Sequence, residues 1–145
     1  MLLIPLLLSE WYVVGFVKPQ SEPIPEVYHY LARVSARGVV SLPIHRGAEW
    51  YLEPGYLYYS TAHWHPIVNG AGRSEPADYY WIAGHMMAFA GPNSARTMRR
   101  LGIDYVVLHA ARPPAGGMLE EALHSSDFHL EARFGSDYLF RVNPR

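Results

Sequence analysis

The sequence predicts an α/β fold: a three-layer sandwich with a mixed, largely parallel central sheet and a C-terminal antiparallel hairpin. Helical apolar patterns are followed, across short loops, by β-branched runs, which is typical of α/β proteins. Residues 128–134 and 137–142 then alternate apolar and polar side chains on either side of a Gly-Ser turn. This alternation predicts two antiparallel strands at the end of the chain.

The length and composition indicate one domain with an apolar start. The chain has 145 residues, and we divide it into an apolar segment, residues 1–17, and a single soluble α/β domain, residues 18–145. Charged residues make up 17%, below the roughly 25% typical of soluble domains, which indicates that another body covers part of the surface. A net charge of −1 with Lys18 as the single lysine argues against nucleic-acid binding. The lack of cysteine excludes disulfides, thiolate metal sites and cysteine nucleophiles.

The apolar segment allows two compatible interpretations. It is interrupted by a proline and a glycine and is shorter than the about 20 apolar residues of a spanning helix. It also lacks the basic start and the cleavage site of a signal peptide. Residues 6–14 are predicted as a buried first strand, or residues 1–8 as the end of a transmembrane helix whose earlier part precedes this chain. In the second case residues 10–12 lie at the membrane interface, where aromatic side chains anchor.

The first half of the domain is expected to alternate helices and short strands. A proline-rich connector, residues 19–25, ends in Pro25, which suits the first turn of a helix. Apolar side chains at helical spacing follow it, and Gly38 closes the helix before a β-branched run. The expected elements are a helix over 26–35, a strand over 39–44, a loop over 45–54, a helix over 56–63, a strand over 66–69 and a loop over 70–76.

The second half contains the clearest strand. Asp78 is expected to cap a helix over 79–90, and Asn93 or Ser94 a second helix that ends before Gly102. The nearly continuous apolar run over 103–109 predicts a strand that is buried on both faces. A loop over 111–117 and a short helix over 118–125 then lead to the two closing strands.

The most specific stretch is residues 56–70 (YLYYSTAHWHPIVNG), which combines aromatics, histidines and hydroxyls. Such side chains bury apolar area and keep polar groups that need partners, so we expect this stretch at a core edge or a cleft rim. Its aromatic rings can stack on sugars or simply pack, and loop arginines (Arg46, Arg73 and Arg112) can bind phosphate groups of a lipid-linked donor or of membrane headgroups. The candidate binding residues are Arg46, Tyr58, Tyr59, His63, Trp64, His65 and Asn69.

Several of these stretches together resemble a known family. They are the connector with residues 25–28, the strand 39–44, the stretch 56–70, the unit 101–109 and the closing strand 137–142. The chain resembles, from about residue 10 to residue 142, the soluble C-terminal domain of bacterial polytopic membrane glycosyltransferases of the GT-C type. It is similar to the dolichyl-phosphate-mannose mannosyltransferase (family 39-like) group. The most specific part of the resemblance is the run from Tyr58 to Gly70.

The resemblance implies an accessory extracytoplasmic domain of a membrane-embedded, glycosyltransferase-like protein. In that family the catalytic acids lie between early transmembrane helices, so the resemblance implies no catalytic residue in this chain. We therefore expect a domain that is non-catalytic on its own and helps to position substrate, without a cofactor or a metal. Its expected partners are the transmembrane portion of the same parent protein and a lipid-linked sugar or other carbohydrate. In-frame hydrophobic segments upstream of Met1 are expected.

Two other functions stay open from the residues alone. The first is a small hydrolase built around Ser60, His63 and His65, either with an Asp78 or Asp104 partner or with a metal ion. A third metal ligand would come from His45, Asp78, His85 or His109. If residues 56–63 are helical, the two imidazoles point about 200° apart and share no ion. The other alternative is a purely structural interaction module.

Overall fold

The computed structural model describes residues 22–45, 52–70 and 77–144. The expectations for residues 1–17, Arg46 and Arg73 lie outside these described residues. In chain order the elements are α2 (Glu26–Leu31), β1 (Val39–Leu42), α3 (Glu53–Ser60), α4 (Ala77–Met87), α5 (Pro92–Leu101), β2 (Tyr105–His109), α6 (Ala115–His124), β3 (Phe128–Phe134) and β4 (Asp137–Val142). Among the described residues, no helix has the length and apolar character needed to cross a bilayer.

The sheet confirms the mixed α/β class, but the prediction of a largely parallel sheet is wrong for the described residues. The strand order is β1-β2-β4-β3, in which β1 and β2 pair in parallel and the other two pairs are antiparallel. The strand expected over 66–69 is reduced to one parallel bridge between Ile67 and Val39. The side chain of Asn69 replaces it, because its amide accepts from the N–H of Ser41 (2.7 Å) and donates to the C=O of Ser41 (2.9 Å).

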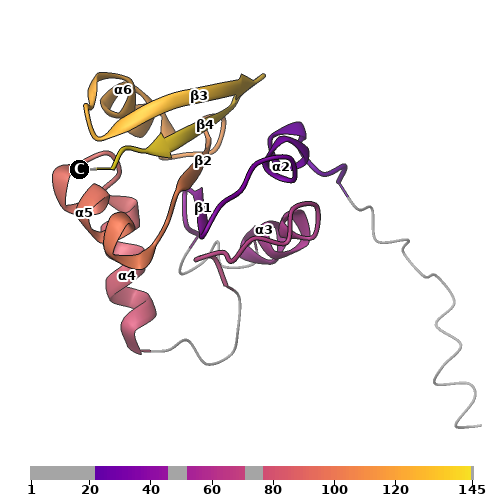
Figure 1. Ribbon diagram of the computed structural model, residues 1–145, viewed down its shortest axis with the longest axis horizontal. Helices are drawn as coiled ribbons and strands as arrows, with labels where there is room; N and C mark the ends of the chain where they lie inside the picture. Colours follow the sequence, from indigo (N-terminus) through magenta and orange to yellow (C-terminus); the bar gives the residue numbers. More distant parts are fainter. Residues whose placement is uncertain (1–21, 46–51, 71–76, 145) are drawn as a thin grey trace, which may run out of the picture.

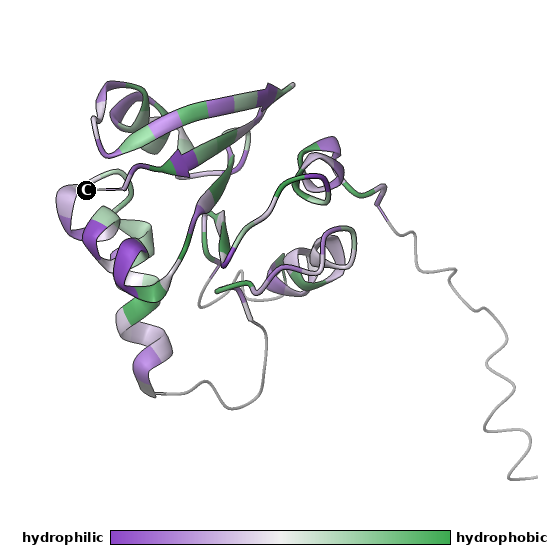
Figure 2. Cartoon of the chain, in the orientation of Figure 1, coloured by the Kyte–Doolittle hydropathy of each residue, from purple (hydrophilic) through white to green (hydrophobic). Residues whose placement is uncertain are grey.

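Helices cover both faces of the sheet (Figure 1). Consecutive strand residues point to opposite faces, so Val39 and Val107 pack with α2 and α3, whereas Val40 and Val106 pack with α4, α5 and α6. Figure 2 shows hydrophobic and hydrophilic residues alternating along β3, the most exposed of the strands. The chain therefore has a separate apolar core on each side of the sheet.

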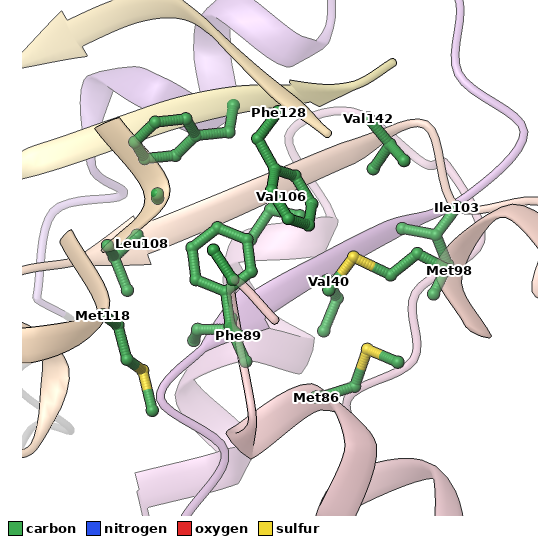
Figure 3. Close-up of a cluster of buried hydrophobic side chains, with 14 of the residues drawn as sticks. Val40, Met86, Phe89, Met98, Ile103, Val106, Leu108, Met118, Phe128 and Val142 are labelled. Carbon is green, nitrogen blue, oxygen red and sulfur yellow. The ribbon is translucent and has the colours of Figure 1, made fainter. Parts of the chain in front are cut away.

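The larger core is built around aromatic rings and methionines. The ring of Phe89, just after α4, meets the ring of Phe128 with centroids 4.7 Å apart and that of Phe140 at 5.8 Å. Figure 3 shows the rings of Phe89 and Phe128 in this core, together with the side chains of Met86 and Met118. This core attaches α4, α5 and α6 to the sheet and leaves the opposite face to a more polar set of side chains.

Several helix ends differ from prediction for local reasons. Helix α3 begins at Glu53, because the proline that follows it suits the first turn, where no N–H is required, and the helix ends at Ser60. Helix α5 begins at Pro92 with Gly91 as its N-cap, so neither Asn93 nor Ser94 is the cap. Asp78 lies inside the first turn of α4, where its charge suits the helix dipole, and does not precede the helix.

Replacing Gly102 with alanine should lower the free energy of unfolding by about 1–2 kcal/mol. Gly102 ends α5 with φ 71°, in the left-handed region, as the sequence predicts. A Cβ there would meet no atom within 4 Å, so the cost comes from the backbone alone. Gly84, inside α4 and equally open, is the matched control, and Gly84→Ala should stabilise by up to about 1 kcal/mol. Urea unfolding of both variants measures the difference, and equal signs would contradict this account.

Candidate functional site

A surface pocket of about 300 Å³ lies at the carboxyl end of β2. In α/β proteins, loops at this end of parallel strands commonly form ligand sites. The pocket combines residues from the approach to α2, from α3, from the loop after β2 and from the turn before β4. Its lining residues are Glu22, Pro23, Pro25, Tyr59, His109, Ala111, Arg112, Ser136 and Asp137.

Arg112 is the cation of this pocket. Its backbone N–H donates to the C=O of His109 (2.9 Å), which holds the loop tightly against the end of β2. The guanidinium carbon lies 5.3 Å from the centre of the Tyr56 ring, a cation–π arrangement. Burial disfavours the charged form, but the hydroxyls of Tyr56 and Tyr59 outweigh it, and the pKa of Arg112 is raised. Among the described residues no carboxylate forms an ion pair with Arg112.

A buried hydrogen-bonded chain forms the floor of the pocket. Asp137 Oδ1 accepts from His109 Nδ1 at 2.8 Å, and His109 Nε2 shares a hydrogen bond with the Tyr28 hydroxyl at 2.8 Å. The Tyr28 hydroxyl is also hydrogen-bonded to Ser41 Oγ at 2.8 Å. Burial, the largest effect, raises the pKa of Tyr28 well above its usual value, so the phenol stays protonated. The chain joins β4, β2, α2 and β1 and fixes the orientation of His109.

A second buried network supports the neighbouring end of β1. Glu53 is 2% exposed, and its carboxylate accepts from the backbone N–H of His45 (2.6 Å) and from the Asn69 amide (3.3 Å). The Tyr56 hydroxyl donates to the C=O of Pro43 at 3.0 Å. These bonds satisfy backbone groups beyond the end of β1. Asn69 and Glu53 therefore hold the strand end and α3 together, away from the pocket surface.

His63 and His65 form a stacked pair near α2. Because α3 ends at Ser60 and Trp64 adopts φ 58°, the imidazoles do not diverge as in a helix, and their centroids lie 5.1 Å apart. His63 Nδ1 accepts from the backbone N–H of His65 at 3.0 Å, and His65 Nε2 donates to the C=O of Leu31 at 3.0 Å. Burial first, and then the charge of His65, lowers the pKa of His63 to about 4.

The structure disperses the other candidates from the aromatic stretch. Tyr59 lines the pocket, and its hydroxyl donates to Glu22 Oε2 at 3.1 Å. Tyr58 and Trp64 are exposed on and after α3, and Asn69 is buried against Ser41. Of the predicted binding residues that are described, Tyr59 is thus the one that lies in the pocket.

The alternative catalytic sets are not assembled by this geometry. The Ser60 hydroxyl donates to the C=O of Leu57 at 2.8 Å, and His63 Nδ1 is occupied by the backbone of His65. Asp104 pairs with Arg37, which lies at 2.7 Å. Among the described residues no group of three histidines, aspartates or glutamates is placed to hold a metal ion.

Sequence reasoning overlooked most of the pocket. The sequence marks His109 only as a candidate metal ligand, Arg112 only as one of three loop arginines, and Asp137 only as a residue of a closing strand. The available signal was position: His109 ends the clearest buried strand and Arg112 follows it, where α/β proteins place ligand sites. Asp137 lies 28 residues further along and reaches His109 only through the antiparallel pairing of β2 with β4.

Comparison of the chain with family models, curated proteins and solved structures finds no match in any of the three.

Proposed function

We propose that this chain is an accessory extracytoplasmic domain of a membrane-embedded, glycosyltransferase-like protein. It is non-catalytic on its own and helps to position a phosphate-bearing sugar. The observation that carries the proposal is Arg112, a half-buried cation that lines the pocket and pairs with phenol hydroxyls instead of a carboxylate. A guanidinium held in this way favours an anionic group of the ligand, and its planar fork matches phosphate oxygens.

The rest of the lining favours a sugar attached to that phosphate. Glu22 and Asp137 offer carboxylate oxygens that accept hydrogen bonds from hydroxyl groups, and Tyr59 adds a phenol. The same carboxylates would repel a bare anion, so a small polyanion without hydroxyl groups fits less well. A sugar phosphate uses both halves of the pocket: the phosphate contacts Arg112 and the hydroxyls contact the acids.

The buried chain beneath the pocket supports positioning over catalysis. Both imidazole nitrogens of His109 have partners inside the protein, and His109 and Tyr28 are only 3% and 1% exposed. A general base needs a ring nitrogen or hydroxyl that is available to its substrate, and in His109 both ring nitrogens are already hydrogen-bonded within the protein. His109 and Tyr28 act as a rigid support for Arg112 and Tyr59.

A binding titration tests this proposal. A hexose 1-phosphate, titrated into the protein and followed by NMR or calorimetry, should bind more tightly than inorganic phosphate or the matching methyl hexoside. Arg112→Met keeps the packing on Tyr56 but removes the charge, and it should weaken hexose 1-phosphate binding by about 10-fold or more, because a hydrogen bond to a charged group contributes about 1.5–3 kcal/mol.

Arg133 offers a matched control. Its guanidinium carbon also lies over a tyrosine ring, 5.1 Å from the centre of Tyr138, but outside the pocket lining. Arg133→Met should leave the affinity unchanged. The proposal fails if the hexose 1-phosphate does not bind, or if both arginine variants bind it as well as the original chain does.

A further inference from the structure

The exposed surface of α3 and the turn after it carries three large apolar side chains. They are Leu57, Tyr58 and Trp64, which are 38%, 44% and 82% exposed, and we call them the α3 face. Trp64 is held outward by a left-handed backbone conformation (φ 58°), which is uncommon for a bulky residue. The backbone N–H of Trp64 donates to the C=O of Ser60 at 2.8 Å, so the turn that carries the exposed indole is attached to the end of the helix.

The α3 face differs from the other exposed aromatics in its charge. Residues 54–70 contain no aspartate, glutamate, lysine or arginine. On α4, by contrast, the half-exposed Trp81 shares a pocket with Asp78 and Arg100. Uncharged side chains such as these leave water at low cost, whereas charged groups are expensive to desolvate. Tyrosine and tryptophan combine an apolar ring with a polar group, which suits the boundary between lipid and water.

The route of the chain points to what contacts this face. The 21 residues before Glu22 begin with the almost wholly apolar residues 1–17. Glu22 itself accepts a hydrogen bond from Tyr59, next to Tyr58 on α3. Glu22, where the described part of the chain begins, thus lies beside α3, and the apolar residues precede it in the sequence.

We propose that the α3 face sits in the headgroup interface of a neutral lipid bilayer. The lack of charge fits zwitterionic lipid, and three side chains are too few for a stable protein interface, which usually takes 20–30 residues on each side. This inference goes beyond the sugar-phosphate pocket and does not depend on it. Membrane contact is tested with lipid vesicles, and the pocket with a soluble ligand, so failure of one is distinguishable from failure of the other.

Site-specific fluorescence in the full chain tests the contact. The chain has no cysteine, so Tyr58→Cys and Tyr80→Cys each create a single labelling site, at side chains that are 44% and 53% exposed. Each variant, labelled with an environment-sensitive fluorophore, is mixed with phosphatidylcholine vesicles. The label at position 58 should shift to the blue and be quenched by spin-labelled lipid. The label at position 80, on α4, should do neither.

A second pair of substitutions separates insertion of the face from membrane binding by the apolar amino-terminal residues. Trp64→Ser, added to the labelled Tyr58→Cys variant, should reduce the blue shift and the quenching, whereas Trp81→Ser should not. Equal responses at positions 58 and 80, or no response at position 58, would overturn the proposal. A blue shift of the label at position 58 before lipid is added would also overturn the proposal. If that shift depends on protein concentration, a second copy of the chain covers the α3 face. If it does not, a segment of the same chain covers it.

Discussion

Replacing Tyr28 with phenylalanine is expected to lower the free energy of unfolding by about 2–4 kcal/mol, measured by urea denaturation. The hydroxyl links Ser41 Oγ and His109 Nε2, each at 2.8 Å, inside the protein. Without it, two buried polar atoms lose a partner, and each such loss costs about 1–3 kcal/mol. The change removes one oxygen and leaves the ring packing with Tyr59 intact.

Tyr30 on the same helix is the control. Its ring packs on Phe134, but its hydroxyl forms no hydrogen bond among the described residues, so Tyr30→Phe should change stability by less than about 0.5 kcal/mol. Ser41→Ala, combined with Tyr28→Phe, should cost less than the sum of the two single changes, because both act on one chain of bonds. Additive costs, or a Tyr28→Phe variant as stable as the original, would show that the coupled hydrogen bonds of Ser41, Tyr28 and His109 contribute little to stability.

Lowering the pH from 7 to 5 should destabilise the protein by about 1–2 kcal/mol through His63 alone. Burial and the neighbouring His65 lower the pKa of His63 to about 4, below its ordinary value near 6.5. Between these two values the unfolded chain binds the proton and the folded protein does not. Stability is therefore retained above about pH 6.5 and lost as the pH falls toward 4. Urea unfolding at several pH values measures the slope.

His63→Asn isolates this effect. The asparagine carbonyl can accept from the N–H of His65 as Nδ1 does, but it does not titrate. The difference between original and variant should therefore shrink as the pH falls from 7 to 5. The Arg37 guanidinium lowers the pKa of Asp104 below its usual 3.8, so the loss of that pairing belongs to more acidic solutions. Parallel pH profiles for the two proteins would refute the assignment.

The local patterns of the sequence predicted the two closing strands well. The two closing strands occupy residues 128–134 and 137–142 as expected, because alternation and a Gly-Ser turn are properties of neighbouring residues. Gly102 ends α5 for an equally local reason, since glycine tolerates the left-handed region. Helix ends were less accurate, because several neighbouring residues can cap a helix, and Gly91 instead of Asn93 or Ser94 caps α5.

The number of parallel strand pairs was not accessible in the same way. Residues 66–69 look like a strand, yet the Asn69 side chain bonds to Ser41 in place of a full backbone ladder. The bonds between Asn69 and Ser41 join residues that are 28 positions apart in the sequence. Neither stretch by itself predicts them.

The candidate site shows the same division. Of the candidate binding residues in the stretch 56–70, Tyr59 lines the pocket, but its neighbours diverge: Trp64 is exposed and His63 is buried. The direction of each of these side chains is set by where α3 ends and by the left-handed turn at Trp64. Both features accompany the packing of α3 against α2.

By itself, the sequence determined the mixed α/β class, the closing strands and the uncharged, aromatic character of the stretch after β1, since these follow from residue type and spacing. Only the tertiary structure decided that Arg112, Tyr59, Asp137 and Glu22 share one pocket. The physical reason is that side chains far apart along the chain meet only where strand pairing and helix packing bring them together. In this protein Arg112 lies in the loop after β2, Asp137 begins β4, and Tyr59 comes from α3. All three line the pocket at the carboxyl end of β2.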